Sequence, residues 1–285
     1  MPDKRSFQGY FQNITSHFPQ RGPGTSGFLL YQLRELVAAI RFLTILPVPG
    51  TTQLFETDEE DESGFIIGSA YFPLIGLLLA VLLWLLLLVT NSIFPPLVLA
   101  ALLVVAQTVL TGGLHLDGLM DTCDGLFGGS TPERKLEIMR DSRVGSFGVL
   151  GGGCILLLRF AAFASMRVQL LTVTLFMVLP VARWAMILAV GVFPGARLSG
   201  LGSAFRRTVT GQHLLAAGIT TVVIVLLAGH LAGLLVLLVG TLVALAVGIL
   251  ISRQLGGLTG DSYGAIEEIT EIVLLLLIIL LHFWF

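Results

Sequence analysis

The sequence predicts an all-α protein, a polytopic integral membrane bundle of about seven transmembrane helices with an additional N-terminal interfacial or re-entrant helix. The 285 residues are 55% hydrophobic and only 12% charged, whereas soluble domains are about a quarter charged. Apolar runs close to the roughly 20 residues of a bilayer crossing also recur along the chain. This composition excludes a disordered chain, a disulfide-rich secreted scaffold and a basic nucleic-acid-binding protein, so we expect no nucleic-acid partner.

The N-terminal region divides into two parts. Residues 1–27 are polar and mixed, and we expect them to form a flexible arm. Residues 28–285 are predicted to form a single membrane-embedded domain. In its first segment, 28–49, apolar residues recur at helical spacing, but Arg34, Glu35 and Arg41 interrupt them. That pattern favours a helix that lies on the membrane surface or is half inserted over one that crosses fully.

The remaining spans follow from the apolar runs. They are predicted at 66–90, 97–115, 148–166, 168–191, 212–228, 230–251 and 264–283. The loops on one side carry almost no cations, whereas the loops on the other side carry Arg134, Lys135, Arg140, Arg143, Arg197, Arg206, Arg207 and Arg253. The positive-inside rule makes the second side cytoplasmic, which predicts a multi-pass protein of the inner (plasma) membrane. Three glycines at 151–153 allow close helix packing within one chain, the favoured interpretation, or in an oligomer.

A row of aspartates marks the longest cytoplasmic segment, 116–147. Asp117, Asp121 and Asp124 are spaced i, i+4 and i+7, so on a helix they share one face, where like charges repel. An alternative interpretation is that these residues are simply the solvated end of a helix. That interpretation explains a single aspartate better than it explains three on one face. Oxygen ligands without histidine or cysteine partners indicate Mg²⁺ or Mn²⁺ rather than zinc. A helix is also predicted over about 132–142, with the preceding threonine as its N-cap.

The second half of this segment supplies cations. Arg140 and Arg143 flank Asp141, and guanidinium groups suit bidentate binding of phosphate. Gly125 and its neighbouring glycines allow a substrate to approach the backbone closely. Carboxylates, arginines and glycines beside a membrane therefore indicate metal-dependent chemistry on a phosphate or diphosphate.

A second polar segment opens the last span on the same side of the membrane. Asp261 stands at its start, where it either contributes to the site or interacts with the helix dipole. Glu267 and Glu271 lie further in, and intramembrane carboxylates usually face protein or a polar cavity. Arg183, inside another span, is a candidate partner for them. His115 is open to three interpretations: a ligand, a general acid or base, or an interfacial histidine.

Several stretches resemble one enzyme family. HLDGLMDTCDGLFGG at 115–129 and EIMRDSRVGSFG at 137–148 resemble adenosylcobinamide-GDP ribazoletransferase, the cobalamin synthase. Further similar stretches, in the same order, are FLTILPVP at 42–49, YFPLIGLLL at 71–79 and GGLTGDSYGA at 256–265. The resemblance implies a Mg²⁺-dependent transferase of the last steps of cobalamin assembly. It implies that adenosylcobinamide-GDP and α-ribazole, or its 5′-phosphate, give adenosylcobalamin, or its 5′-phosphate, and GMP.

The resemblance and the residue chemistry together assign roles on the cytoplasmic side. The predicted metal ligands are Asp117, Asp121, Asp124 and Asp141. The predicted substrate- and cofactor-binding residues are Arg140, Arg143, Gly125 and Asp261. The general base is expected, in falling order, among Asp141, His115 and Glu267.

Two other functions remain open. The CDP-alcohol phosphotransferases carry D-x2-D-G-x2-A-R followed by G-x3-D-x3-D. Asp121, Asp124 and Gly125 match the opening of that pattern, but Gly128 and Gly129 stand in place of Ala-Arg, and the closing aspartates are missing. A transporter would explain charged residues inside spans, but it predicts inverted repeats that we do not find in the sequence.

Overall fold

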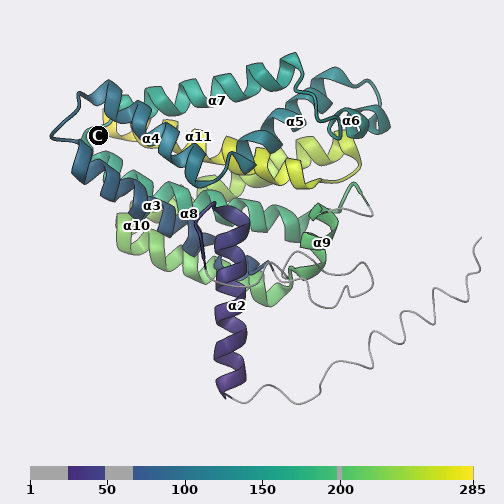
Figure 1. The fold of residues 1–285 in the computed structure, drawn as a ribbon, viewed down its shortest axis with the longest axis horizontal. Helices are drawn as coiled ribbons and strands as arrows, with labels where there is room; N and C mark the ends of the chain where they lie inside the picture. The colour runs from purple at the N-terminus through teal and green to yellow at the C-terminus, as the bar shows by residue number, and fades with distance from the viewer. Residues whose placement is uncertain (1–24, 49–66, 198–200, 285) are drawn as a thin grey trace, which may run out of the picture. The chain divides into compact units, whose positions relative to one another are not determined.

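The computed structural model describes residues 25–48, 67–197 and 201–284, and these are almost entirely helical (Figure 1). They confirm the predicted all-α class. The chain divides into two units, Met1–Arg34 and Glu35–Phe285, and helix α2 (Thr25–Leu43) contributes to both. Most of the arm predicted at 1–27 lies outside the described residues, so the domain boundary after residue 27 stays a prediction. The helix expected within 28–49 is α2, which begins earlier than predicted, at Thr25; its position in the bilayer stays a prediction.

The other helices follow the predicted order. The long ones are α3 (Phe72–Thr90), α4 (Pro96–Leu110), α7 (Ser146–Ser165), α8 (Val168–Val192), α10 (Gly211–Leu255) and α11 (Gly260–Trp284). The short ones are η3 (Ser69–Tyr71), α5 (Leu114–Gly128), α6 (Pro132–Ile138) and α9 (Leu201–Thr208). The aspartate row therefore lies on a helix of its own, α5, rather than in an irregular loop.

The count of seven transmembrane helices is not confirmed. Among the described residues, four helices are long and apolar enough to cross a membrane, and the pair α4 and α5, bent by 87°, makes a fifth if it is one broken span. The spans predicted at 212–228 and 230–251 are joined in α10, which is interrupted at His230 with φ 51°. A Cβ on Gly233 would collide with the carbonyl of Val225, so the chain folds back there. Helix α11 carries three glutamates and is not among the four.

Helix α11 is central to the second unit, packed against α5, α7, α8 and α10 (Figure 1). Every residue from Ser262 to Glu268 is buried. Its glutamates therefore face protein rather than lipid, as expected for carboxylates inside a membrane bundle.

Glycines bring several of these helices into close contact. A Cβ on Gly76 of α3 would stand 2.5 Å from the carbonyl oxygen of Leu179 in α8. On α7, Gly151 and Gly152 pack against side chains of α5, Cys123 and Met120 respectively. The favoured interpretation of these two glycines, packing within one chain, is confirmed.

Candidate active site

Helix α5 presents the aspartate row. The chain turns sharply into it through Gly112 and Gly113, whose φ angles of 61° and 70° suit glycine. Along the helix the side chains become progressively less accessible: Asp117 is exposed, Asp121 is half-buried and Asp124 is buried. The three aspartates therefore share one face of α5, as predicted, and this face lies next to the bend that follows α4.

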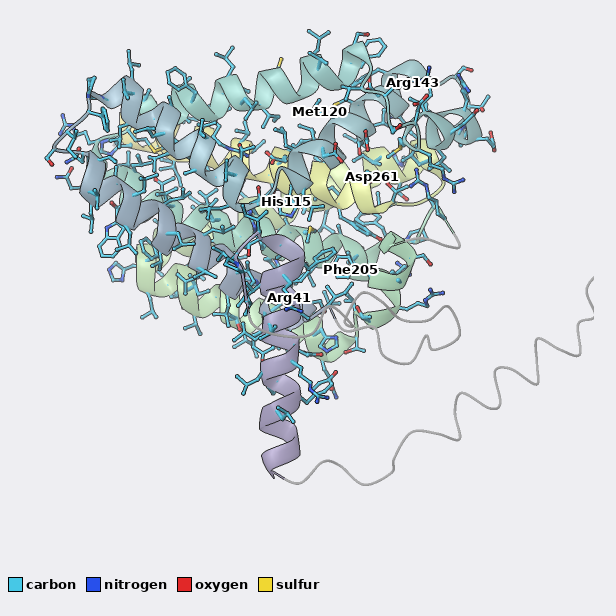
Figure 2. All side chains as sticks on the ribbon, viewed as in Figure 1. Arg41, His115, Met120, Arg143, Phe205 and Asp261 are labelled. Atoms are coloured by element: carbon cyan, nitrogen blue, oxygen red, sulfur yellow. The ribbon has the colours of Figure 1, made fainter. Side chains whose placement is uncertain are left out.

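The crossing of α5 and α11 is the closest contact around the site. A Cβ on Gly118 of α5 would stand 2.7 Å from the carbonyl oxygen of Asp261. A Cβ on Gly264 of α11 would stand 2.9 Å from a backbone oxygen of α5. Figure 2 shows Asp261 at the end of α11 that lies against α5. Its carboxylate is near enough to interact electrostatically with Asp117 and Asp121. Three carboxylates thus gather where the two backbones touch.

Arg197 faces this cluster from the loop after α8. The amide of Ala196 donates to the carbonyl of Leu258, and the amide of Leu258 donates to the carbonyl of Pro194, both over 2.8 Å. This pairing of two loops places a guanidinium nitrogen of Arg197 3.5 Å from Asp261 Oδ2. Burial raises the pKa of the Asp261 carboxyl, and Arg197 partly opposes that rise. The sequence did not predict this partner, because neither loop carries a local signal for the pairing.

Asp124 and Gly125 have packing roles in the structure. The two carboxylate oxygens of Asp124 accept hydrogen bonds from the amides of Gly145 (2.7 Å) and Gly148 (2.8 Å), at the start of α7. The carboxylate therefore satisfies donors that a helix N-terminus leaves open. A Cβ on Gly125 would meet Met139 and the carbonyl of Lys135, so this glycine lets α6 pack closely on α5. Metal binding by Asp124 and substrate binding by Gly125 stay predictions.

Helix α6 carries the basic part of the motif. Its N-cap is Thr131, as predicted, and the hydroxyl of this residue accepts a hydrogen bond from the amide of Arg134. The helix ends at Ile138, earlier than the predicted residue 142, because the chain turns there into the loop before α7. Arg140 lies exposed in that loop.

Asp141 is held by Arg143 in the same loop. Nε and Nη2 of Arg143 donate to the two carboxylate oxygens over 3.0 and 2.7 Å. These bonds lower the pKa of Asp141 to about 2. A carboxylate that acidic is a weak proton acceptor at neutral pH, so the geometry favours a role in orienting Arg143 over the role of general base.

A polar pocket of about 460 Å³ opens between α5, α6 and the start of α7, and we call it the α6 pocket. Both positively and negatively charged side chains line it. Its lining includes Asp124, Arg134, Glu137, Asp141, Arg143 and Phe147. The structure therefore brings Asp124, Asp141 and Arg143 of the predicted site together, whereas Asp261 lies at the α5–α11 crossing.

The two other candidate bases lie inside the bundle. His115 Nδ1 is 3.3 Å from Glu267 Oε2, and Nη1 of Arg183 is 2.5 Å from Glu267 Oε1. All three side chains are almost fully buried. Arg183 is thus confirmed as a partner of the intramembrane acids. His115 and Glu267 contact one another, but they are far more enclosed than the exposed Asp141.

This buried network extends through α4 and α7. Nε of Arg159 is 2.9 Å from Glu271 Oε1, and the same guanidinium pairs with Glu268. The side-chain amide of Gln107 lies 2.8 Å from both oxygens of Glu271. Sequence reasoning did not identify Gln107, because one amide in an apolar run has no periodic signal. The network fixes α11 against α4, α7 and α8 in the helical turns that follow Asp261.

The donors at the α5–α11 crossing suit a hard cation. Asp117, Asp121 and Asp261 offer only carboxylate oxygens, which Mg²⁺ prefers, and a cation would relieve their mutual repulsion. In the ranges that the structure describes, no three His, Cys, Asp or Glu side chains already adopt a metal-binding arrangement. The predicted set of four aspartates, three on α5 and one in the loop before α7, is therefore not preformed.

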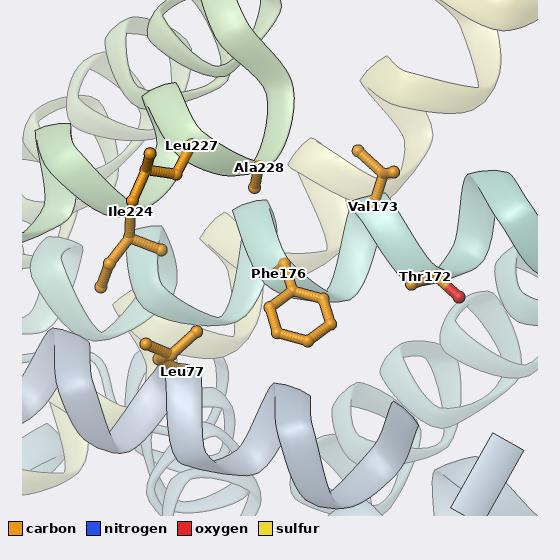
Figure 3. Close-up of a pocket in the computed structure, with 7 residues that line it drawn as sticks. All are labelled: Leu77, Thr172, Val173, Phe176, Ile224, Leu227 and Ala228. Carbon is orange, nitrogen blue, oxygen red and sulfur yellow. The ribbon is translucent and has the colours of Figure 1, made fainter. Parts of the chain in front are cut away.

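A second pocket, of about 250 Å³, lies between α3, α8 and α10 (Figure 3). Phe176, Ile224 and Leu227 are typical of its lining, and Thr172 contributes a hydroxyl. None of the predicted site residues lines it. Its apolar walls offer no groups for phosphate chemistry.

Comparison with known proteins identifies the family. The model of the family described as cobalamin-5-phosphate synthase matches residues 35–279. The chain belongs to this family.

A protein named adenosylcobinamide-GDP ribazoletransferase from Desulfitobacterium hafniense is 41% identical over 249 residues, which are 86% of this chain and 96% of that protein. Proteins of the same name from Roseiflexus sp. and Syntrophobacter fumaroxidans are each 40% identical, over 83% of this chain and 86% and 94% of their own lengths. No solved structure matches the chain. The family makes the chain a transferase, and the aspartate row and the α6 pocket lie within the matched region.

Proposed function

We propose that this transferase joins adenosylcobinamide-GDP to α-ribazole, or to its 5′-phosphate, in a Mg²⁺-dependent reaction. The products are adenosylcobalamin, or its 5′-phosphate, and GMP. A ribose hydroxyl attacks the phosphorus attached to the cobinamide, the new P–O bond forms, and GMP leaves with the electrons of the broken P–O–P bond. The hydroxyl proton passes to a base.

The observation that carries this proposal is the coincidence of the family match with the carboxylates at the α5–α11 crossing. Asp117, Asp121 and Asp261 would hold Mg²⁺. When bound, the ion supplies neutralisation of the charge that develops on the diphosphate and on departing GMP. Carboxylates that hold a metal ion beside arginines suit a diphosphate substrate. The end of an ordinary helix does not require such a cluster of acids.

The arginines of the site would bind and orient phosphate. Arg143 is exposed and presented by Asp141, and Arg140 stands free of secondary structure in the same loop. A planar guanidinium binds phosphate oxygens in a bidentate manner. Arg197 faces Asp261 and partly offsets the rise in the pKa of that carboxyl that burial causes. Excess cations on this side also support a cytoplasmic site in the inner membrane, by the positive-inside rule.

A turnover assay on the purified protein in detergent tests the proposal. The reaction contains adenosylcobinamide-GDP and α-ribazole, with either Mg²⁺ or EDTA, and both products are quantified. We expect cobalamin and GMP in equal amounts with Mg²⁺ and neither with EDTA. The proposal would be contradicted if the folded protein formed no product under conditions in which a known synthase is active, but transferred the phosphoalcohol group of a CDP-alcohol to a second alcohol with release of CMP.

A further inference from the structure

The α6 pocket combines three kinds of chemistry on one surface. Arg134 and Arg143 supply cations, Glu137 and Asp141 supply carboxylates, and Phe147 supplies an aromatic ring. The ring centroid of Phe147 lies 5.8 Å from that of Phe127, at the end of α5, and both side chains are exposed. Cations bind phosphate, aromatic rings stack on nucleobases, and carboxylates accept hydrogen bonds from base N–H groups.

The volume limits which part of a substrate fits. At about 460 Å³ the pocket falls within the roughly 300–1,000 Å³ of ligand sites. A corrin ring with its side chains is far larger than a nucleotide, so only the nucleotide half of the cobinamide substrate or the ribazole nucleoside is small enough. This argument rests on the proposed function.

The carboxylates decide between these two. The Watson–Crick edge of guanine presents an N1–H and an N2 amino group, two donors that pair with one carboxylate. The benzimidazole of ribazole has no N–H donor, so it can form no such pair with a carboxylate of the pocket. The pocket chemistry therefore fits guanine.

The two carboxylates are not equally available. Both oxygens of Asp141 accept hydrogen bonds from Arg143. Glu137 instead contacts Arg134 through Oε2, 2.6 Å away, in a pair whose partners are both more than half exposed. Exposed ion pairs of this kind contribute little to stability, so a ligand can rearrange them.

We infer that the α6 pocket binds the guanosine 5′-phosphate half of the substrate, with Glu137 as the residue that selects guanine. Glu137 accepts the N1–H and N2–H donors, Phe147 stacks on the base, and Arg134 and Arg143 bind the phosphates. Asp124, which lines the pocket, is about one helical turn from Asp121, so the phosphates run from the pocket toward the carboxylates of the α5–α11 crossing.

Nucleotide binding to the full-length protein in detergent tests this inference. GMP, IMP and AMP are titrated separately, because IMP lacks the N2 amino group and AMP carries an acceptor at N1. We expect the wild-type protein to prefer GMP over IMP by on the order of tenfold. Glu137→Gln should remove that preference and leave IMP binding nearly unchanged. Glu133→Gln, on the same helix but outside the pocket, is the matched control and should behave like the wild type.

A second variant keeps the test decisive if Glu137→Gln does not fold. Phe147→Leu retains an apolar side chain but loses the stacking surface. Because stacking tolerates any base, all three nucleotides should lose affinity by a similar factor, at least about fivefold, with the GMP preference retained. Unchanged GMP affinity in this variant would overturn the inference.

Turnover measured on the same preparations separates this inference from the proposed function. Turnover of adenosylcobinamide-GDP without any preference for GMP, or with a preference that survives Glu137→Gln, overturns the guanine site and leaves the proposed function intact. A GMP preference that depends on Glu137, in protein without that turnover, supports the nucleotide site and overturns the proposed function.

Discussion

The crossing of α5 and α11 leaves no room for a methyl group at Gly118. A Cβ there would stand 2.7 Å from the carbonyl oxygen of Asp261 and 3.0 Å from its Cα, whereas ordinary contacts begin at 3.4 Å. Since both obstructing atoms are backbone, Gly118→Ala must separate the two helices by about 0.7 Å, the difference between 3.4 and 2.7 Å. The separation moves Asp261 away from Asp117 and Asp121.

The expected effect is on the reaction more than on folding. Misplacing a reacting group by about 1 Å costs on the order of 100-fold in rate, so a shift of this size should lower kcat about 10- to 100-fold. Overpacking costs about 1–3 kcal/mol of stability, and the better helix propensity of alanine offsets up to about 1 kcal/mol of that. Turnover and thermal unfolding in detergent are measured together.

The matched control lies on α7, where a Cβ on Gly153 meets nothing within 4 Å. Gly153→Ala should keep wild-type turnover and unfold at the same temperature or slightly higher. If Gly118→Ala also turned over at the wild-type rate, the closeness of the two backbones would not be what positions Asp261, and this reasoning would be refuted.

Three further predictions concern the charged groups. Arg183→Met leaves buried Glu267 without its guanidinium, so thermal unfolding should show a loss of about 3–5 kcal/mol, reduced in Arg183→Lys; an unchanged midpoint would contradict the role of the network. Because burial raises the pKa of Asp261, protons compete with Mg²⁺ at a higher pH than at an ordinary aspartate. The Mg²⁺ concentration for half-maximal rate should therefore increase as pH falls, and earlier in Arg197→Gln; a requirement independent of pH would exclude Asp261 as a ligand. Asp141→Asn should raise KM more than it lowers kcat, because the ionised carboxylate orients Arg143; a fall in kcat of about 100-fold or more at constant KM would instead identify a base.

Features set by neighbouring residues could be predicted from the sequence. The apolar runs gave the order of the helices, the i, i+4, i+7 spacing gave the shared face of Asp117, Asp121 and Asp124, and Thr131 marked the start of α6. Each depends on residues within a few turns of one another, where helical periodicity and capping preferences act.

Of the features set by residues far apart in the chain, the pairing of Arg183 with the acids of α11 was predicted, because charges inside apolar spans need partners. Most of the others could not be predicted. The contact of Gly118 with Asp261 depends on how two helices cross, and the pair of Arg197 with Asp261 depends on two loops that hydrogen-bond. The count of seven spans stays unconfirmed, because apolar runs alone do not show which helices cross the membrane. The reversal at His230 falls at the predicted boundary between 212–228 and 230–251, whereas the burial of the charged turns of α11 among ion pairs does not follow from hydropathy.

The central claim is that phosphoryl transfer takes place at the α5–α11 crossing. The most direct test measures the rate of GMP release from adenosylcobinamide-GDP. Asp121→Asn and Asp261→Asn are each assayed across a Mg²⁺ titration. Loss of a metal-binding carboxylate removes several kcal/mol of transition-state stabilisation, so we expect both variants to fall about a thousandfold or more at saturating α-ribazole. Glu133→Gln should retain the wild-type rate. Folded variants at both positions that release GMP as fast as the wild type, with the same Mg²⁺ dependence, would contradict the account.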